Sequence, residues 1–274
     1  MLGSESAHYY NAEGAPCFEV PYADKSKGMR PVTLRDAKKM RLYPSVTTII
    51  DDTLRKYGLD IYKGNQLIDA TWAHLQAWEE WNIPIGVREP STEDRDEIRI
   101  RARQHSSDAA DFGTNVHTFI YKFLDTGYCA LDDDLAWLAE WLGVQDLKTT
   151  YLEMPFISNK RTARHGGRIV PPYGGTIDFL GWWGGNGVII DWKTQATKPG
   201  KPINTYQTWG TQLAAYADAR DSDLDCYNVV ISSTEPGRIE VVEWDCRDIL
   251  DHGDYFECLY YLWCSPLVKG WTPK

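Results

Sequence analysis

The fold is decided by the stretch Val188-Ile-Ile-Asp-Trp-Lys-Thr194 of this 274-residue sequence. Charged and apolar residues alternate in it, which predicts a β-strand whose successive side chains point to opposite faces. The alternation places Asp191 and Lys193 on one face, and Ile190 and Trp192 on the other. One face of the strand is therefore available for chemistry, while the other packs.

A second acidic strand precedes this stretch. In Gly175-Thr-Ile-Asp-Phe-Leu180 the same alternation separates Asp178 from its apolar neighbours. The run Gly184-Gly-Asn-Gly187 lies between the strands expected at 173–183 and 188–194, and it predicts a hairpin turn. A hairpin can bring the carboxylates of both strands together. Because Mg²⁺ and Mn²⁺ are hard cations that prefer oxygen ligands, these carboxylates predict a site for one or two such ions.

The periodicity of the remaining sequence predicts an α/β fold. Apolar residues recur at helical spacing in the segments 45–82, 91–126, 132–146, 205–219 and 247–263. Further strands are expected from Tyr151, with Glu153 inside, and at 227–233 and 238–244. The core order is helix, three strands, helix, two strands, helix, which predicts a central mixed β-sheet flanked by helices. Residues 1–42 show no clear strand period and are expected to form an irregular extension.

The bulk composition is that of a globular protein. Hydrophobic residues make up 43% of the chain and charged residues 25%, which fits neither a disordered chain nor a coiled coil. The formal net charge of −10 argues against nonspecific coating of nucleic acid, although a local basic channel is compatible with it. Acidic side chains at a metal site add to this charge without repelling an anionic substrate once a cation is bound.

The cysteines and the apolar segments help to predict the cellular compartment of the protein. Six cysteines are scattered without a C-x-x-C pair, so free thiols in a reducing compartment are expected. No apolar run approaches the roughly 20 residues that span a bilayer, and the N-terminus lacks a basic segment leading into an apolar one. We therefore expect a cytoplasmic protein without a membrane partner.

The D-x-K pattern at Asp191 and Lys193 is weak evidence when taken alone. A strand end often carries an exposed ion pair worth at most about 1 kcal/mol, and this is the more common explanation. Three further features favour a functional site over a structural ion pair. They are Asp178, a helical His117 upstream, and a downstream helix with Gln212 and Tyr216 on one face.

These features resemble the PD-(D/E)XK nuclease superfamily, and within it the RecB-like branch of phage exonucleases and related mitochondrial genome-maintenance exonucleases. The resemblance covers roughly residues 104–245. The family's G-x-x-x-H helix, acidic strand, D-x-K strand and Q-x-x-x-Y helix look like Gly113-Thr-Asn-Val-His117, Gly175-Thr-Ile-Asp178, Asp191-Trp-Lys193 and Gln212-Leu-Ala-Ala-Tyr216. Pro44-Ser-Val-Thr-Thr-Ile-Ile50 is similar to the opening of phage-type members.

The resemblance implies a restriction-endonuclease-like core with αβββαβ order. We expect this core and a C-terminal helix in residues 104–274, preceded by an N-terminal extension and helical region at 1–103 that flanks a DNA channel. The implied catalytic residues are Asp178, Asp191 and Lys193, with Lys193 as the catalytic lysine. The implied ligands of Mg²⁺ or Mn²⁺ are His117, Asp178, Asp191 and the backbone carbonyl of Trp192. The family pattern also implies that Gln212 and Tyr216 approach the site and the DNA backbone.

Four candidate residues keep an alternative explanation, and for Gln212 and Tyr216 it is that they simply cap the core with polar tips. From spacing alone, His117 could be a hydrogen-bonded helix histidine, and only the motif context favours a ligand. Glu153 could be a charge at the rim of an edge strand. It could equally reach the metal through water or hold Lys193.

A basic, glycine-rich stretch lies between the first two expected strands. It is Arg161-Thr-Ala-Arg-His-Gly-Gly-Arg168. Such a stretch is more often a solvated loop, but its residues are well suited to contacting phosphates. Arg161, Arg164 and Arg168 are therefore the leading candidates for DNA contacts outside the metal site.

An iron-sulfur cluster is a further alternative, because some RecB-like nucleases carry one on a distal N-terminal cysteine and a C-terminal trio. Cys246, Cys258 and Cys264 are the residues that raise it. The expected C-x-x-C pair is missing, since Tyr255 and Tyr261 stand on either side of Cys258 at that spacing. We therefore do not expect a cluster.

The sequence thus predicts a metal-dependent DNA exonuclease that acts from DNA ends in recombination, replication or repair. A phage or prokaryotic source is expected, with the host cytoplasm as the compartment if the protein is phage-encoded. Recombination or replication proteins are candidate partners. The alternatives are an endonuclease of the same superfamily and a catalytically silent DNA-binding module on the same fold.

Overall fold

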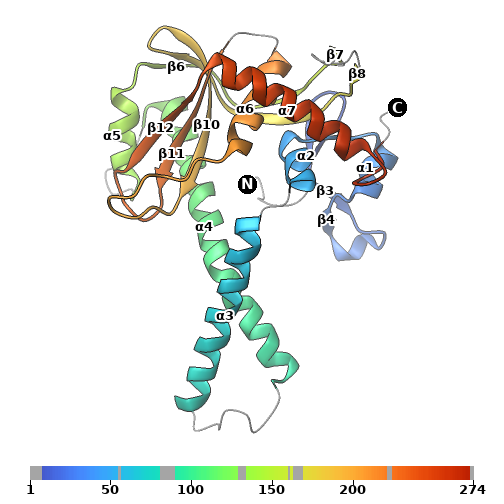
Figure 1. Cartoon of the computed structure of the whole chain (residues 1–274), viewed down its shortest axis with the longest axis vertical. Coiled ribbons are helices and arrows are strands. Elements are labelled where there is room, and N and C mark those ends of the chain that lie inside the picture. Colours follow the sequence, from blue (N-terminus) through green and yellow to red (C-terminus); the bar gives the residue numbers. More distant parts are fainter. Residues whose placement is uncertain are drawn as a thin grey trace. The chain divides into compact units, whose positions relative to one another are not determined.

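The computed structural model describes residues 8–54, 57–80, 90–128, 134–159, 161–162, 169–220 and 224–271. The chain forms two compact units, residues 1–54 with 114–274, and residues 55–113 (Figure 1). The first unit contains the central sheet. The division expected at residues 103 and 104 remains a prediction. Packing joins the N-terminal segment to the core.

The central sheet has five strands in the order β12-β11-β10-β9-β6. The strands are β6 (Leu147–Ile157), β9 (Gly174–Trp183), β10 (Asn186–Gln195), β11 (Asp225–Ser232) and β12 (Ile239–Trp244). β10 and β11 run parallel, whereas the other neighbours are antiparallel, so the sheet is mixed as predicted. β10 is the middle strand and is therefore buried from Val188 to Trp192.

The predicted hairpin joins β9 and β10. Gly184 and Gly185 have φ values of 58° and 94°, which glycine adopts without steric cost and which a two-residue hairpin turn needs. The pairing of β9 with β10 runs from Trp183–Asn186 to Phe179–Ile190.

The helix α6 (Gln207–Arg220) lies between β10 and β11 in the chain, and α7 (Cys246–Cys264) follows β12, in the order predicted. α6 contacts β10 and β11, and α7 packs against α6 and α2 (Val46–Thr53) (Figure 1). α6 is buried from Gly210 to Ala217. A Cβ atom at Gly210 would lie only 2.6 Å from the His252 ring of α7, so this close packing needs glycine.

α4 (Thr92–Thr126) and α5 (Ala136–Val144) precede the sheet. Ser91 and Asp94 cap the start of α4 reciprocally, with N···O distances of 3.1 and 2.7 Å, as the Ser-Thr-Glu-Asp signal predicts. Gly127 ends α4 with φ 67°. The residues of α4 from Thr114 belong to the first unit, and among them Val116 and Ile120 are buried.

The N-terminal segment is not the irregular extension that its sequence suggested. It forms β1 (Tyr9–Tyr10), β2 (Pro16–Cys17), β3 (Glu19–Pro21), β4 (Met29–Pro31), α1 (Leu34–Met40) and β5 (Tyr43–Pro44). These strands are two or three residues long, too short for a detectable period. Their buried residues join the main core, where Tyr9 stacks on Trp271 at 6.5 Å between ring centroids.

The second unit comprises α3 (Tyr57–Glu80) and the part of α4 before Thr114. His74 and Asp94 are both buried, with Nε2 and Oδ1 3.3 Å apart. Arg99 and Arg101 pair with Asp96 and Glu97 on the exposed surface of α4.

Two further observations complete the fold. The short strands β7 (Arg161–Thr162) and β8 (Ile169–Val170) pair with each other. Within the described ranges, no helix combines the length and the apolar character needed to cross a bilayer.

Candidate metal centre

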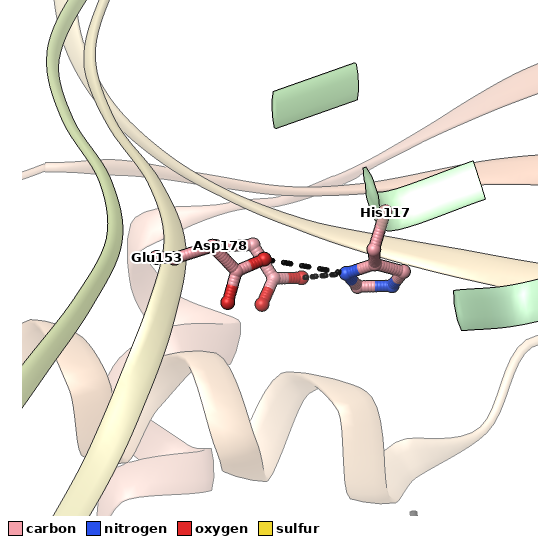
Figure 2. Close-up of side chains that lie close together, drawn as sticks. All are labelled: His117, Glu153 and Asp178. Carbon is pink, nitrogen blue, oxygen red and sulfur yellow. Dashed lines mark ion pairs between the residues drawn. The ribbon is translucent and has the colours of Figure 1, made fainter. Parts of the chain in front are cut away.

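Three side chains from three elements converge in the first unit. His117 comes from α4, Glu153 from β6 and Asp178 from β9 (Figure 2). Nδ1 of His117 lies 3.7 Å from Oε1 of Glu153 and 3.7 Å from Oδ2 of Asp178. One ligand atom from each residue lies within 4.8 Å of the others. One imidazole nitrogen and two carboxylate oxygens form a donor set that fits a divalent cation such as Mn²⁺ or Mg²⁺.

An unusual backbone conformation places Glu153 in this cluster. The pairing of β6 with β9 includes Leu152–Phe179 and Met154–Ile177, so Glu153 lies opposite Asp178. Glu153 has φ 46°, in the left-handed region that non-glycine residues rarely adopt. Two carboxylates directly opposite one another on neighbouring strands repel. The fold therefore holds Glu153 in place against both effects.

Asp178 lies where β9 and β10 stop pairing. The last cross-strand pair is Phe179–Ile190, and beyond it the N–H of Trp192 donates to Oδ2 of Asp178 at 2.9 Å. A side chain thus replaces the main-chain partner that a continued ladder would supply. This exchange fixes the Asp178 carboxylate beside the D-x-K strand.

The titration of the cluster follows from its burial and its charges. Burial disfavours the charged form of His117, but the carboxylates of Asp178, Glu153 and Asp191 outweigh it and raise the His117 pKa to about 9. Burial raises the pKa of Asp178, and the neighbouring carboxylates of Asp191 and Glu153 add to this, although His117 and Lys193 oppose it. Excess negative charge of this kind is what a bound cation neutralises.

The D-x-K residues form a second group beside the first. Nζ of Lys193 lies 2.7 Å from Oδ2 of Asp191. Gln212 of α6 joins the two, because its Nε2 donates to Oδ1 of Asp191 at 3.0 Å and its Oε1 accepts from Lys193 at 3.1 Å. Nε2 of Gln212 also donates to the hydroxyl of Tyr216 at 2.8 Å. The structure thus brings together Asp191, Lys193, Gln212 and Tyr216.

The compact set of side-chain ligands shares His117 and Asp178 with the expected one and differs from it in a single side chain. Among the described residues it contains Glu153, whereas Asp191 directs its oxygens to Lys193, Gln212 and Asn228. The carbonyl oxygen of Trp192 lies 3.2 Å from Nε2 of His117, which ties α4 to β10. Each carboxylate oxygen has two lone pairs, so Oδ1 of Asp191 retains acceptor capacity for a ligand.

The basic stretch lies mostly outside the described residues. Arg164 and Arg168 lie outside the described residues. Arg161 belongs to β7, but its side chain also lies outside the description. The expectation that these arginines contact DNA stays a prediction.

Three residues near the site carry no signal in the sequence pattern. Asn228 of β11 and Trp244 of β12 are buried; Asn228 donates a hydrogen bond to Asp191, and Trp244 donates one to Asn228. Tyr10 of β1 donates or accepts a hydrogen bond with Thr176 of β9 at 3.0 Å. Burial raises the pKa of Tyr10, and the carboxylates of Glu153 and Asp178 add to the rise. Single residues in short or apolar strands give no periodic pattern by which they could be identified.

A cavity of about 780 Å³ lies elsewhere in the first unit. Its lining includes Lys38, Lys39, Arg41 and Trp271 but none of the residues of the metal cluster. The assignment of a metal centre therefore rests on the convergence of its donor atoms and not on this cavity.

Comparison with known proteins relates the chain to one family. A family model described as the PD-(D/E)XK nuclease superfamily matches residues 94–230. A search of curated proteins finds no significant match. Similar solved structures include one titled "Crystal structure of SSO0001", which is 14% identical with a TM-score of 0.33. That alignment covers 73% of this chain and 85% of the other.

Proposed function

Because the chain belongs to the PD-(D/E)XK nuclease superfamily, we propose that it is a Mg²⁺- or Mn²⁺-dependent deoxyribonuclease that hydrolyses phosphodiester bonds from DNA ends. The observation that carries the proposal is the convergence of His117, Glu153 and Asp178 within 4.8 Å. The paired Asp191 and Lys193 lie on the strand beside this cluster. A ligand set and a cationic side chain are the two parts that metal-assisted hydrolysis needs.

The residues of the centre have distinct roles in this proposal. His117, Glu153 and Asp178 hold the first ion, and Asp191 with the Trp192 carbonyl completes or extends the ligand set. The bound ion supplies Lewis acidity at a phosphate oxygen and lowers the pKa of water. Lys193 orients the attacking water and offsets developing negative charge, while Gln212 keeps its ammonium group beside Asp191.

The finer assignments rest on the sequence motifs. We propose that the chain is a member of the RecB-like branch, that Gln212 and Tyr216 support the site at the DNA backbone, and that Arg161, Arg164 and Arg168 contact phosphates. The biological setting would be DNA recombination, replication or repair in a phage or a prokaryote. Proteins of those processes would be its partners.

The substrate class is tested by direct cleavage assays. End-labelled linear DNA and closed circular DNA, each single- and double-stranded, are incubated with Mg²⁺, Mn²⁺ or a chelator. An exonuclease degrades linear DNA only with the metal and leaves closed circles intact. Nicked or linearised circles would instead identify an endonuclease of the same superfamily. DNA binding without cleavage under any metal would identify a silent binding module.

Lys193→Ala tests the catalytic assignment. We expect the cleavage rate to fall by about 100- to 10,000-fold, the range typical of a lost proton-transfer or charge-stabilising group. DNA affinity, measured by fluorescence anisotropy in Ca²⁺, should change little. Lys148→Ala is the matched control, since Lys148 is an exposed lysine of β6 with a side chain 72% accessible. Near-normal turnover by Lys193→Ala would contradict the assignment.

A further inference from the structure

Asn228 is a buried amide in the middle of an apolar strand. It is 0% exposed and is followed in β11 by Val229, Val230 and Ile231, which are also buried. Burying an amide costs free energy unless its donors and acceptor find partners. The parallel register of β10 and β11 pairs Asn228 with Asp191. The amide thus lies next to the D-x-K motif, in a position where it needs hydrogen-bond partners.

The hydrogen bonds of Asn228 connect Asp191 to a tryptophan. Nδ2 of Asn228 donates to Oδ2 of Asp191 at 2.7 Å and lies 3.3 Å from the Asp191 carbonyl oxygen. Oδ1 of Asn228 accepts from Nε1 of Trp244 at 2.8 Å. Asp191 is 2% exposed and Trp244 is 8% exposed, so bulk water does not readily replace these bonds.

The indole determines which way the amide faces. Trp Nε1–H can only donate, and a carboxylate can only accept. If the amide rotated by half a turn, its NH₂ group would face the indole N–H and its oxygen would face the Asp191 carboxylate. Both contacts would then be repulsive. Trp244 thus favours the orientation in which Asn228 donates to Asp191.

We propose that Trp244 and Asn228 form a positioning relay that holds the Asp191 carboxylate in the orientation required beside the metal cluster and Lys193. The relay rests on the proposed function and adds two residues that act through Asp191. Gln212 holds Oδ1 of Asp191 from α6, and Asn228 holds Oδ2 from β11. Without Asn228, the carboxylate loses one of its two protein amide donors and gains freedom to rotate.

The experiment compares two Trp→Phe variants. Trp244→Phe keeps an aromatic ring but removes the indole donor to Asn228. Trp263→Phe is the matched control, because Trp263 is also buried and its Nε1 donates to Oδ2 of Asp52 at 2.9 Å, away from Asp191. Both variants should lose comparable thermal stability. Outer partners of metal ligands typically contribute about 10- to 100-fold in affinity or activity.

The expected results separate positioning from general destabilisation. Trp244→Phe should weaken Mn²⁺ binding, measured by calorimetry, by about tenfold and lower kcat without raising the KM for DNA. Trp263→Phe should leave both unchanged. In the double variant with Asn228→Leu, Trp244→Phe should add no further loss beyond that of Asn228→Leu, since it acts through Asn228. Equal effects of Trp244→Phe and Trp263→Phe, or additive losses in the double variant, would overturn the relay.

A measurement on the unaltered protein covers the case in which the variants do not fold. The Asn228 side-chain amide protons should exchange slowly with solvent in NMR spectra, since both are buried near acceptors. Rapid exchange would overturn the relay. Wild-type protein that binds no Mn²⁺ and cleaves no DNA would overturn the proposed function and the relay with it, whereas failure of the relay alone leaves wild-type binding and cleavage intact.

Discussion

Glu153 combines two unfavourable features at one position. Its left-handed backbone costs a non-glycine residue roughly 1–2 kcal/mol. Its carboxylate also lies opposite that of Asp178 on the neighbouring strand β9. Strained residues that persist in a fold are concentrated at functional sites. This supports the ligand role for Glu153 over a charge at the rim of the sheet, the alternative that the sequence left open.

Substitutions at Glu153 distinguish the ligand from the strain. Glu153→Gln keeps the shape but removes the charge, so Mn²⁺ affinity measured by calorimetry should fall by at least about tenfold. Glu153→Gly also removes the ligand, but it suits the positive φ and relieves the repulsion with Asp178. Its metal-free unfolding free energy, from urea titration, should therefore exceed that of Glu153→Ala, which loses the same carboxylate but keeps the strained backbone. Unchanged Mn²⁺ affinity in Glu153→Gln would return Glu153 to the role of an edge charge.

The pKa shifts of the cluster predict how pH affects metal binding. A cation competes with the protons of His117, whose pKa is raised to about 9, and of Asp178, whose pKa is also raised. Mn²⁺ affinity should therefore increase as the pH rises toward about 9, with protons released on binding. Calorimetry in buffers of different ionisation enthalpy measures that release. His117→Gln should flatten the increase above neutral pH, and an unchanged slope would contradict the assignment.

The same pKa shifts determine how the stability of the folded protein changes with pH. Both groups bind their proton more tightly in the folded chain than in the unfolded one. The contribution of His117 to the unfolding free energy is fully present below the pKa of its side chain in the unfolded protein, near 6.5. It is lost as the pH rises through the folded-state pKa of about 9. The metal-free protein should accordingly lose stability over this range, and a bound divalent cation should restore it.

At the scale of elements, β9 contains a glycine that the sheet requires. A Cβ atom at Gly181 would lie 2.3 Å from the carbonyl oxygen of Lys148 in β6, a backbone atom that cannot turn away. Gly181→Ala should therefore lower the unfolding free energy by about 1–3 kcal/mol in urea titration. Gly143→Ala in α5 is the control, since among the described residues its Cβ would meet only Phe123, at 3.9 Å. Equal stability of the two variants would contradict the close packing of β6 against β9 at Gly181.

The longer elements were predictable because their periods extend over many residues. The alternation through Asp178 and Asp191 identified β9 and β10. The N-terminal strands were missed because two or three residues do not define a period. Glu153 was identified as a candidate, but its position depends on a local φ of 46° that no side-chain pattern encodes. Asn228 was missed because its partner Asp191 is a neighbour in the sheet and not in the sequence.

At the scale of the whole molecule, the net charge of −10 and the metal centre belong together. His117, Glu153, Asp178, Asp191 and Lys193 carry three carboxylates around one lysine and one histidine. A divalent cation bound there adds positive charge, which favours an anionic substrate. The acidic character of the protein is thus compatible with an anionic substrate, as the sequence suggested.

The N-terminal and C-terminal segments close a common core. Tyr9 stacks on Trp271, and Trp263 lies 5.4 Å from Trp271 between ring centroids. Trp263 and Lys269 also bind the carboxylate of Asp52. During translation, β1 and α2 leave the ribosome long before α7 exists to cover them. Folding of the first unit is therefore expected to finish only after synthesis of α7 and Trp271, so that a ribosome-bound fragment lacking them does not yet hold a complete nuclease.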